Sequence, residues 1–175
     1  MSEGVTIRTL REDEAAPFLE LRKATDAQSR YLLYEAGERR TTVEEQGRAM
    51  AELLDAPNST ILVAEAGPDR GLVGYLIAKG GSARRNRHAA EIVIALLEAY
   101  TGKGVGKGLF RALDEWAIGA GVTRLGLGLM AENARAKALY EKMGFREEGR
   151  KQAAFLLEGG YMDEILMYRL LGANS

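Results

Sequence analysis

The spacing of hydrophobic and polar residues along the chain predicts alternating helices and strands. Apolar residues recur at helical spacing in residues 105–120, where Val105, Leu109, Leu113 and Trp116 fall on one side of a helix. Further helices are expected over residues 13–25, 42–54 and 134–143. Strands are expected over residues 5–10, 60–66, 72–79, 89–98 and 124–130, with a last pair around Gly159–Gly160.

Local signals fix some of these boundaries. Thr42 and Glu45 have the spacing of a capping box at a helix start, and Pro57 ends the same helix. Residues 67–71 carry two glycines and a proline between two apolar runs, which predicts a hairpin turn. About seven strands and about four helices result, which predicts an α/β (α+β) fold with a mixed sheet and helices on both faces.

Composition excludes several classes of protein. The 175 residues contain no linker-like or low-complexity stretch, so we expect a single domain over residues 1–175. With 24 basic and 25 acidic residues, the chain lacks the basic excess of a non-specific nucleic-acid binder. It has no cysteine and one histidine, which argues against disulfides, a thiol acyl-enzyme and a metal site.

The sequence predicts neither a secretory signal nor a membrane span. The first residues lack the basic and apolar regions of a secretory signal. No uninterrupted apolar run reaches the roughly 18–20 residues that a membrane span requires. We therefore expect a cytoplasmic protein without a membrane partner.

The glycines give the first chemical signal, because four of the seven residues from Gly102 to Gly108 are glycine. This loop stands between an apolar strand and an amphipathic helix. Glycines let an anion approach the backbone amides, and the helix start adds unpaired N–H groups and partial positive charge. The loop is therefore a candidate phosphate or pyrophosphate cradle, although a plain glycine-rich turn fits the same residues.

The spacing separates this loop from two common nucleotide motifs. A Walker loop needs a hydroxyl residue after its lysine, but Gly108 follows Lys107. A dinucleotide fingerprint lacks its last glycine here, because Lys107 occupies that position. A nucleotide-dependent phosphate enzyme is therefore disfavoured.

The wider segment Tyr100–Leu109 resembles the coenzyme A loop of the GNAT superfamily of acyl-CoA N-acyltransferases. That loop reads Gln/Arg-x-x-Gly-x-Gly/Ala after a strand; Gly104 and Gly106 match it, whereas Thr101 stands where Gln or Arg is usual. Residues 133–145 resemble the second signature of the family, in which an Asn opens a short helix that carries a Tyr and ends in Gly-Phe. Alone, Asn133 would be read as a helix cap and Tyr140 as a core residue.

The resemblance implies a GNAT-like, mostly antiparallel sheet and acetyl transfer from acetyl-CoA to a primary amine. Direct attack by the amine in a ternary complex suits a chain without cysteine. The implied coenzyme ligands are Asn133 and backbone groups of Leu96, Leu97, Glu98, Thr101, Gly102, Lys103, Gly104, Val105, Gly106, Lys107 and Gly108. Tyr140 would be the general acid that protonates the departing thiolate.

The base that takes a proton from the amine is less defined. Glu91 lies on the strand that leads to the loop, about where some GNAT members carry a catalytic Glu, although the residues slightly favour an outward-facing strand carboxylate. Glu98 and His88 are weaker candidates, and a chain of water molecules would need none of them.

The acceptor is expected between residues 26–41 and 157–163, the segments that set acceptor specificity in this family. In the first segment, Arg30, Arg39 or Arg40 could hold a carboxylate, and Glu35 or Glu38 could hold a cationic amine. The acceptor could be a small molecule or a protein N-terminus. The apolar run Ile165–Tyr168 is compatible with a homodimer, and a non-catalytic acyl-CoA-binding module is the alternative function.

Overall fold

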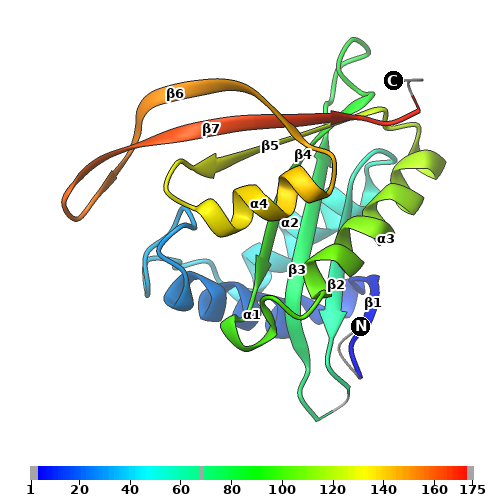
Figure 1. Cartoon of the computed structure of the whole chain (residues 1–175). Coiled ribbons are helices and arrows are strands. Elements are labelled where there is room, and N and C mark those ends of the chain that lie inside the picture. Colours follow the sequence, from blue (N-terminus) through cyan, green and yellow to red (C-terminus); the bar gives the residue numbers. More distant parts are fainter. Residues whose placement is uncertain (1–3, 68, 173–175) are drawn as a thin grey trace.

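The computed structural model describes residues 4–67 and 69–172. It contains one seven-stranded sheet in the order β1-β2-β3-β4-β5-β7-β6, in which β4 and β5 form the parallel pair and every other pair is antiparallel. Helices α3 and α4 lie on one face and α1 and α2 on the other (Figure 1). The strands are β1 (Thr6–Thr9), β2 (Thr60–Glu65), β3 (Leu72–Gly80), β4 (Ala89–Leu96), β5 (Arg124–Met130), β6 (Arg146–Leu157) and β7 (Gly160–Leu170). The helices are α1 (Ala15–Gln28), α2 (Val43–Asp55), α3 (Val105–Ala120) and α4 (Ala134–Lys142).

The central strands are mostly apolar because helices cover much of both of their faces. In β4, Ala90 and Ile92 face α3 and α4, where they join the larger core cluster with Leu109 and Phe110. Ala95 faces the other way and packs with Phe18 of α1 and Met50 of α2. Alternate residues of β4 therefore point to opposite faces, and Glu91 and Val93 share the face of α1 and α2.

The parallel pair β4–β5 is short and then opens. Its register joins Ala89, Ala90 and Glu91 to Arg124, Leu125 and Gly126, and the pairing ends there. Beyond this point β4 continues to Leu96 and β5 to Met130, and the two strands diverge (Figure 1). We call this opening, bounded by residues 92–96 and 127–130, the β4–β5 fork. Edges that face it keep backbone groups available for a ligand, because ladder partners are missing.

The β6–β7 hairpin extends beyond the rest of the sheet and is kinked by a bulge (Figure 1). Between Lys151 and Phe155, two extra residues of β6 interrupt its register with β7, and Ala153 adopts a positive φ of 51°. Asp163 stabilises this turn, since its carboxylate accepts hydrogen bonds from the Ala153 N–H and from Arg150 Nε, both at 2.8 Å. These donors also lower the pKa of Asp163, the Ala153 amide most strongly.

The predicted element order and sheet composition are confirmed, with small shifts at the boundaries. The first helix runs over 15–28 after a short 3-10 turn (Glu12–Glu14), and the strand expected to reach residue 98 ends at Leu96. A 3-10 turn, Glu98–Tyr100, follows β4 because Thr101 bonds back to the Glu98 carbonyl through its N–H and Oγ1. Gly67 and Gly71 bound the predicted turn, while Pro68 lies outside the described residues.

Two further expectations concern surfaces. Ile165 and Met167, from the run that suggested a dimer, are buried in the core shared with α3 and α4, which explains why the last strand is apolar. Among the described helices, none combines the length and the hydropathy that a membrane span requires.

Candidate active site

The glycine loop ends in an uncapped helix start that faces outward. Gly104 is the N-cap of α3 with a φ of 85°, and Gly102 has a φ of 71°, so both positions favour glycine. The first hydrogen bond of the helix joins the Gly108 N–H to the Gly104 carbonyl at 3.0 Å. The amides of Val105, Gly106 and Lys107 are therefore without helical partners, as the phosphate-cradle interpretation requires.

Positive side chains surround this loop, and one of them was not predicted. A Cβ at Gly102 would lie 2.8 Å from Nη2 of Arg135, so the Arg135 guanidinium covers the loop from the second residue of α4. Lys103 and Lys107 add two exposed ammonium groups. The first turn of α3 contains no acidic residue, so nothing there opposes an anion.

Gly106 has a packing role in addition to its free amide. A Cβ at this position would lie 3.1 Å from Leu139 of α4 and 3.7 Å from Leu96 of β4. The glycine therefore allows α3 to approach α4 beside the β4–β5 fork. This contact fixes the loop, the end of β4 and α4 relative to one another.

The fork narrows the set of backbone groups expected to hold the coenzyme. The Leu97 N–H donates to the Val73 carbonyl at 2.9 Å, and the Glu98 N–H donates to Gln28 Oε1 at 2.8 Å. Because donors of an antiparallel pair alternate in direction, residues 92, 94 and 96 point toward the fork. Of Leu96, Leu97 and Glu98, the structure thus leaves the Leu96 backbone directed at the opening.

Two other predicted coenzyme residues have local partners. Thr101 Oγ1 donates to the Glu98 carbonyl at 2.7 Å, which shapes the turn into the loop. Asn133 is the N-cap of α4, and its Oδ1 accepts a hydrogen bond from the Ala136 N–H at 3.2 Å. Its amide group Nδ2 has no protein partner within the described residues and can donate to a ligand.

Tyr140 lies in an aromatic cluster on the α3–α4 side of the fork. Its ring packs against Phe110 and Phe145, with ring centroids 5.9 Å and 6.2 Å away. The side chain is 8% exposed, and burial raises the pKa of Tyr140 to about 12. The phenol therefore remains protonated at neutral pH and can act as a hydrogen-bond donor.

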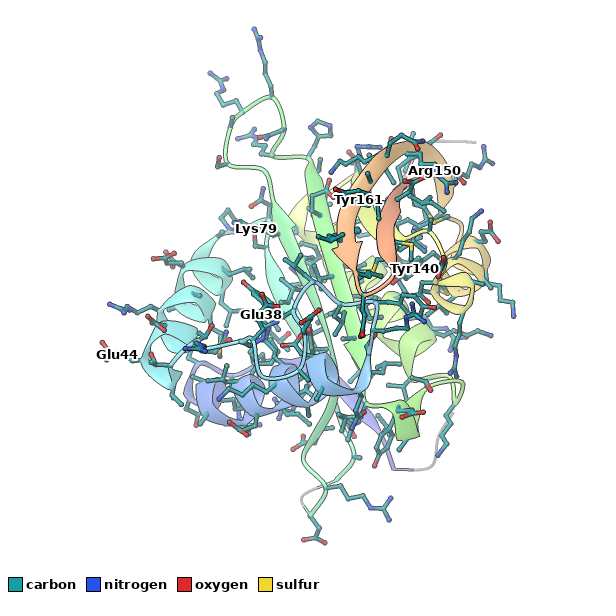
Figure 2. All side chains as sticks on the ribbon, turned by 90° about the vertical axis from the view of Figure 1, so that its left-hand side faces the viewer. Glu38, Glu44, Lys79, Tyr140, Arg150 and Tyr161 are labelled. Carbon is teal, nitrogen blue, oxygen red and sulfur yellow. The ribbon has the colours of Figure 1, made fainter. Side chains whose placement is uncertain are left out.

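Glu91 lies at the last paired position of β4 and points to the face of α1 and α2. It is exposed, and a Cβ at Gly126 would lie 2.6 Å from its Oε1, so its carboxylate rests on the bare backbone of β5. Lys79 is its cross-strand neighbour on β3. Figure 2 shows Lys79 on one side of the central strands and Tyr140 on the other, below the β6–β7 hairpin.

The weaker base candidates lie at the two ends of β4. His88 precedes Ala89, and β4 has 8 residues, which places His88 about 26 Å from the end of β4 that leads to the glycine loop. Its backbone carbonyl accepts hydrogen bonds from Thr123 and Arg124. Glu98 is exposed beyond the far end of the strand, in the turn before the loop.

The segment between α1 and α2 is held by a buried ion pair. Arg39 Nε lies 2.6 Å from Asp26 Oδ2, and both side chains are nearly inaccessible to solvent. The Arg39 guanidinium also covers the Tyr34 ring at 4.4 Å. Arg39 therefore organises this segment, and it is not free to hold an acceptor carboxylate.

The remaining charged candidates in that segment are exposed. Arg30 lies over the Tyr31 ring at 5.4 Å, and Arg40 is exposed. Glu38 accepts a hydrogen bond from the Glu35 N–H at 2.9 Å, which closes a local turn. In the second acceptor segment, residues 157–163, Tyr161 is exposed at the hairpin tip and pairs with Leu156 (Figure 2).

Metal ligands do not gather near these groups. Within residues 4–67 and 69–172, no three His, Asp or Glu side chains are arranged to hold a metal ion. The groups that the structure brings together are instead a cradle of amides, a fork with open backbone, a buried phenol and an exposed carboxylate. This combination suits a phosphorylated, elongated ligand with its reactive end between the phenol and the carboxylate.

Comparison with known sequences decides the family. Residues 21–145 match the sequence model of the acetyltransferase (GNAT) family. The chain belongs to the GNAT family. The matched range includes the glycine loop, Glu91, Asn133 and Tyr140, so the predicted membership is confirmed over most of the chain.

Relatives of known sequence are N-acetyltransferases. The L-amino acid N-acetyltransferase AaaT of Escherichia coli is 31% identical over 122 residues, covering 67% of this chain and 72% of that protein. The match with the uncharacterized N-acetyltransferase YycN of Bacillus subtilis is 34% identical and shorter, covering 45% of this chain and 51% of that protein. The chain thus spans about half the length of some relatives that it matches.

Solved structures confirm the fold. A GNAT acetyltransferase of Streptococcus pneumoniae superposes with a TM-score of 0.89 at 24% identity, covering 95% of this chain and 99% of that chain. A phosphinothricin acetyltransferase of Sinorhizobium meliloti, solved with acetyl-CoA, gives a TM-score of 0.82 at 20% identity over 97% of this chain and 89% of that chain. Acetyl-CoA is therefore bound by a member of this GNAT fold, as expected for the cosubstrate.

Proposed function

We propose that this GNAT protein transfers an acetyl group from acetyl-CoA to a primary amine by direct attack in a ternary complex. Residues 1–175 would act as one catalytic domain. The observation that carries the proposal is the β4–β5 fork leading directly into a cradle of unpaired amides. One end can hold a pyrophosphate, and the other presents open backbone to the pantetheine arm and the thioester.

The coenzyme would bind along this path. The amides of Val105, Gly106 and Lys107 would hold the pyrophosphate, with Arg135 neutralising part of its charge. The Leu96 backbone would pair with the pantetheine arm, and Asn133 Nδ2 would donate to the coenzyme. The thioester is already activated, so the protein mainly needs to position the reactants. Positioning can supply on the order of 7–11 kcal/mol of the barrier, because the entropy of bringing the reactants together is lost on binding.

Tyr140 would assist the departing thiolate. Its hydroxyl remains protonated because burial raises its pKa to about 12. A thiol has a pKa of about 8.5, so complete transfer of the phenolic proton to the sulfur would be uphill. The main contribution of Tyr140 would therefore be a hydrogen bond to the sulfur as negative charge develops, with protonation completed as the coenzyme leaves.

Glu91 would accept the proton that the amine loses. Its carboxylate lies on the face of α1 and α2, at the point where β4 and β5 separate, and an amine can approach the thioester from that side. The carboxylate is exposed, so it would act directly or through one water molecule. A backbone amide that faces the fork would stabilise the oxyanion of the tetrahedral intermediate.

The acceptor is a small amine or a protein N-terminus. The name of the Escherichia coli relative, an L-amino acid N-acetyltransferase, puts α-amino acids on the list of candidates. The exposed tip residues Leu156 and Tyr161 could contribute to a homodimer, whose formation size-exclusion chromatography with light scattering would test.

Two measurements test the proposed function. Calorimetry should detect acetyl-CoA binding, and amine-dependent thiol release should occur with at least one member of a panel of diamines, amino acids, aminoglycosides and peptides. Binding without release on any acceptor would favour the non-catalytic module, and no binding would contradict both. Mass spectrometry of the protein should show no acetyl-enzyme, because attack is direct.

A further inference from the structure

On the face of α1 and α2, two alternate positions of β5 carry no side chain, and we call these positions the floor of the fork. Gly126 and Gly128 of β5 point to the face of α1 and α2, because the residues between and beside them, Leu125, Leu127 and Leu129, are buried on the other face. Val93 of β4 borders this floor and is 50% exposed. A strip of bare backbone therefore runs along β5 beside the opening, in which Gly128 is exposed and Gly126 is buried beneath the Glu91 side chain.

Two carboxylates lean over this strip from opposite sides. Glu91 comes from β4, and a Cβ at Gly126 would lie 2.6 Å from its Oε1. Glu164 comes from β7, and a Cβ at Gly128 would overlap its Oε1 and lie 2.9 Å from its Cδ. Alternate residues of a strand are about 7 Å apart, so the carboxylates stand over neighbouring positions of one floor.

Glu91 and Glu164 lie at different positions along the β4–β5 fork. Glu91 is opposite Gly126, at the last paired position of β4 and β5, which is the apex of the fork. Glu164 is opposite Met130, the last residue of β5, where the two strands have already separated. An amine that attacks a thioester in the fork would thus have Glu91 at the apex and Glu164 across the opening.

Glu164 already forms an ion pair with a lysine side chain in this structure. Its Oε2 lies 2.9 Å from Lys151 Nζ of β6, and the Glu164 side chain is 18% exposed while that of Lys151 is 62% exposed. The Glu164 carboxylate is thus held against the sheet, whereas the Lys151 ammonium extends into solvent from β6. A cationic group entering from the fork could replace the lysine at little cost, because the Lys151 ammonium is exposed to solvent and an ion pair with an exposed partner contributes little stability.

We propose that Glu164 binds a second cationic group of the acceptor, so that the chain acetylates small diamines in preference to monoamines. The inference rests on the proposed function, and it names the acceptor class. One amine, deprotonated beside Glu91, attacks the thioester carbon. The other remains an ammonium ion and takes the place of Lys151 Nζ on Glu164.

The test compares 1,4-diaminobutane with n-butylamine, which has the same chain and lacks the second ammonium group. In the wild-type chain, kcat/KM for the diamine should exceed that for the monoamine by about tenfold or more, the ratio expected for one charge-assisted contact. Glu164→Gln should abolish the preference for the diamine by raising the KM for the diamine. The kcat/KM for n-butylamine should stay within about twofold of the wild-type value. Lys151→Met should lower KM for the diamine, because the competing ammonium is gone.

Glu148→Gln is the matched control, because it removes a carboxylate and an ion pair, with Arg124, from the same hairpin without approaching the fork. It should leave the diamine-to-monoamine ratio unchanged. Two results would overturn the inference while leaving acetyl transfer intact. One is an equal loss of kcat/KM with both amines in Glu164→Gln, and the other is a wild-type preference for a monoamine or an α-amino acid.

Binding provides a readout that does not depend on turnover. With coenzyme A present, calorimetry should detect 1,4-diaminobutane binding to the wild-type chain and to Glu148→Gln, and tenfold weaker binding to Glu164→Gln. Unchanged binding in Glu164→Gln would contradict the role of Glu164. A chain that binds the diamine in this pattern but acetylates no amine would contradict the proposed function, and with it the acceptor preference, while supporting the binding role of Glu164.

Discussion

Gln28, the last residue of α1, accepts a hydrogen bond from the Glu98 backbone N–H at 2.8 Å through its Oε1. This bond joins the acceptor side of the molecule, where α1 leads into residues 29–41, to the turn between β4 and the glycine loop. The two residues are 70 positions apart in sequence. The relationship predicts that Gln28 affects coenzyme binding without touching the coenzyme.

Gln28→Ala should raise KM for acetyl-CoA severalfold and leave kcat within about twofold, because the lost bond contributes about 1 kcal/mol to the position of the turn. Initial rates over a range of acetyl-CoA concentrations measure both constants. Gln28→Glu retains an acceptor oxygen and should behave like the wild type. Equal effects of the two substitutions would argue against this role for the hydrogen bond.

Arg135→Ala should weaken acetyl-CoA binding by about tenfold, because it removes a charge-assisted contact with the phosphates. Dephospho-coenzyme A, which lacks the 3′-phosphate, should show the same loss, since Arg135 covers Gly102 of the pyrophosphate loop. Lys137→Ala, which removes a positive charge from the same helix and its pairs with Glu141 and Glu147, is the control. If Arg135→Ala and Lys137→Ala weaken acetyl-CoA binding equally, Arg135 contributes only through the overall charge of the protein.

Tyr140→Phe should lower kcat by about 10²-fold at unchanged KM for acetyl-CoA, because it removes the hydrogen bond that stabilises the charge developing on the departing sulfur. The raised pKa also affects stability. The folded state keeps the phenolic proton to about pH 12, whereas an unfolded chain releases it near the ordinary tyrosine pKa of 10.0. The free energy of unfolding therefore falls as pH rises through this interval, by at most about 1.4 kcal/mol per pH unit. Urea titrations at pH 9 and 11 should show this contribution in the wild type and not in Tyr140→Phe.

Gly126→Ala should reduce kcat by about tenfold or more, because a Cβ there would lie 2.6 Å from Glu91 Oε1 and displace the proposed base. Gly119→Ala tests the same substitution in open space, since no atom lies within 4 Å of a Cβ at that helical position. It should keep full activity and gain up to about 1 kcal/mol of stability. Thiol-release rates and urea midpoints measure the two effects.

Asp26→Asn should cost about 3–5 kcal/mol of unfolding free energy, because it leaves the buried Arg39 guanidinium without its carboxylate. The matched control is Glu20→Gln on the same helix. Glu20 pairs with Lys23 at 3.6 Å in an exposed position, and its loss should cost less than about 0.5 kcal/mol. Similar costs for the two variants would show that Arg39 finds another partner.

Local sequence signals predicted most of the fold. Residues 105–120 and 124–130 form α3 and β5 with the expected bounds, because helical spacing and an apolar run are properties of neighbouring residues. The Thr42–Glu45 capping box is present, with the Glu45 N–H bonded to Thr42 Oγ1 at 3.2 Å. The free amides after Gly104 were predicted for the same reason.

Contacts between segments that are far apart in the sequence cannot be predicted from such local signals. The separation of β4 from β5 depends on the register of two strands that are joined through α3, and no local pattern encodes where the pairing stops. Arg39 looked available for an acceptor because its partner, Asp26, lies 13 residues away in another element. Ala153 has a positive φ without being glycine, because Asp163 of the opposite strand stabilises the bulge.

Two proposed site residues went unnoticed in the sequence for related reasons. Arg135 stands two residues after Asn133, a place that a helix-start pattern could have flagged, but its approach to Gly102 requires α4 to pack beside α3. Glu164 lies in an alternating strand and looks like an ordinary surface carboxylate. Its place on the floor of the fork emerges only because β7 is inserted between β5 and β6.

Acetyl transfer by direct attack is tested by thiol release from acetyl-CoA in the presence and absence of 1,4-diaminobutane, with mass spectrometry of the amine. Direct transfer requires amine-dependent release, one acetylated amine for each thiol, and a drop in rate of about 10²-fold in Tyr140→Phe. Acetyl-CoA binding without release on this or any other amine in the panel would contradict catalysis by direct transfer.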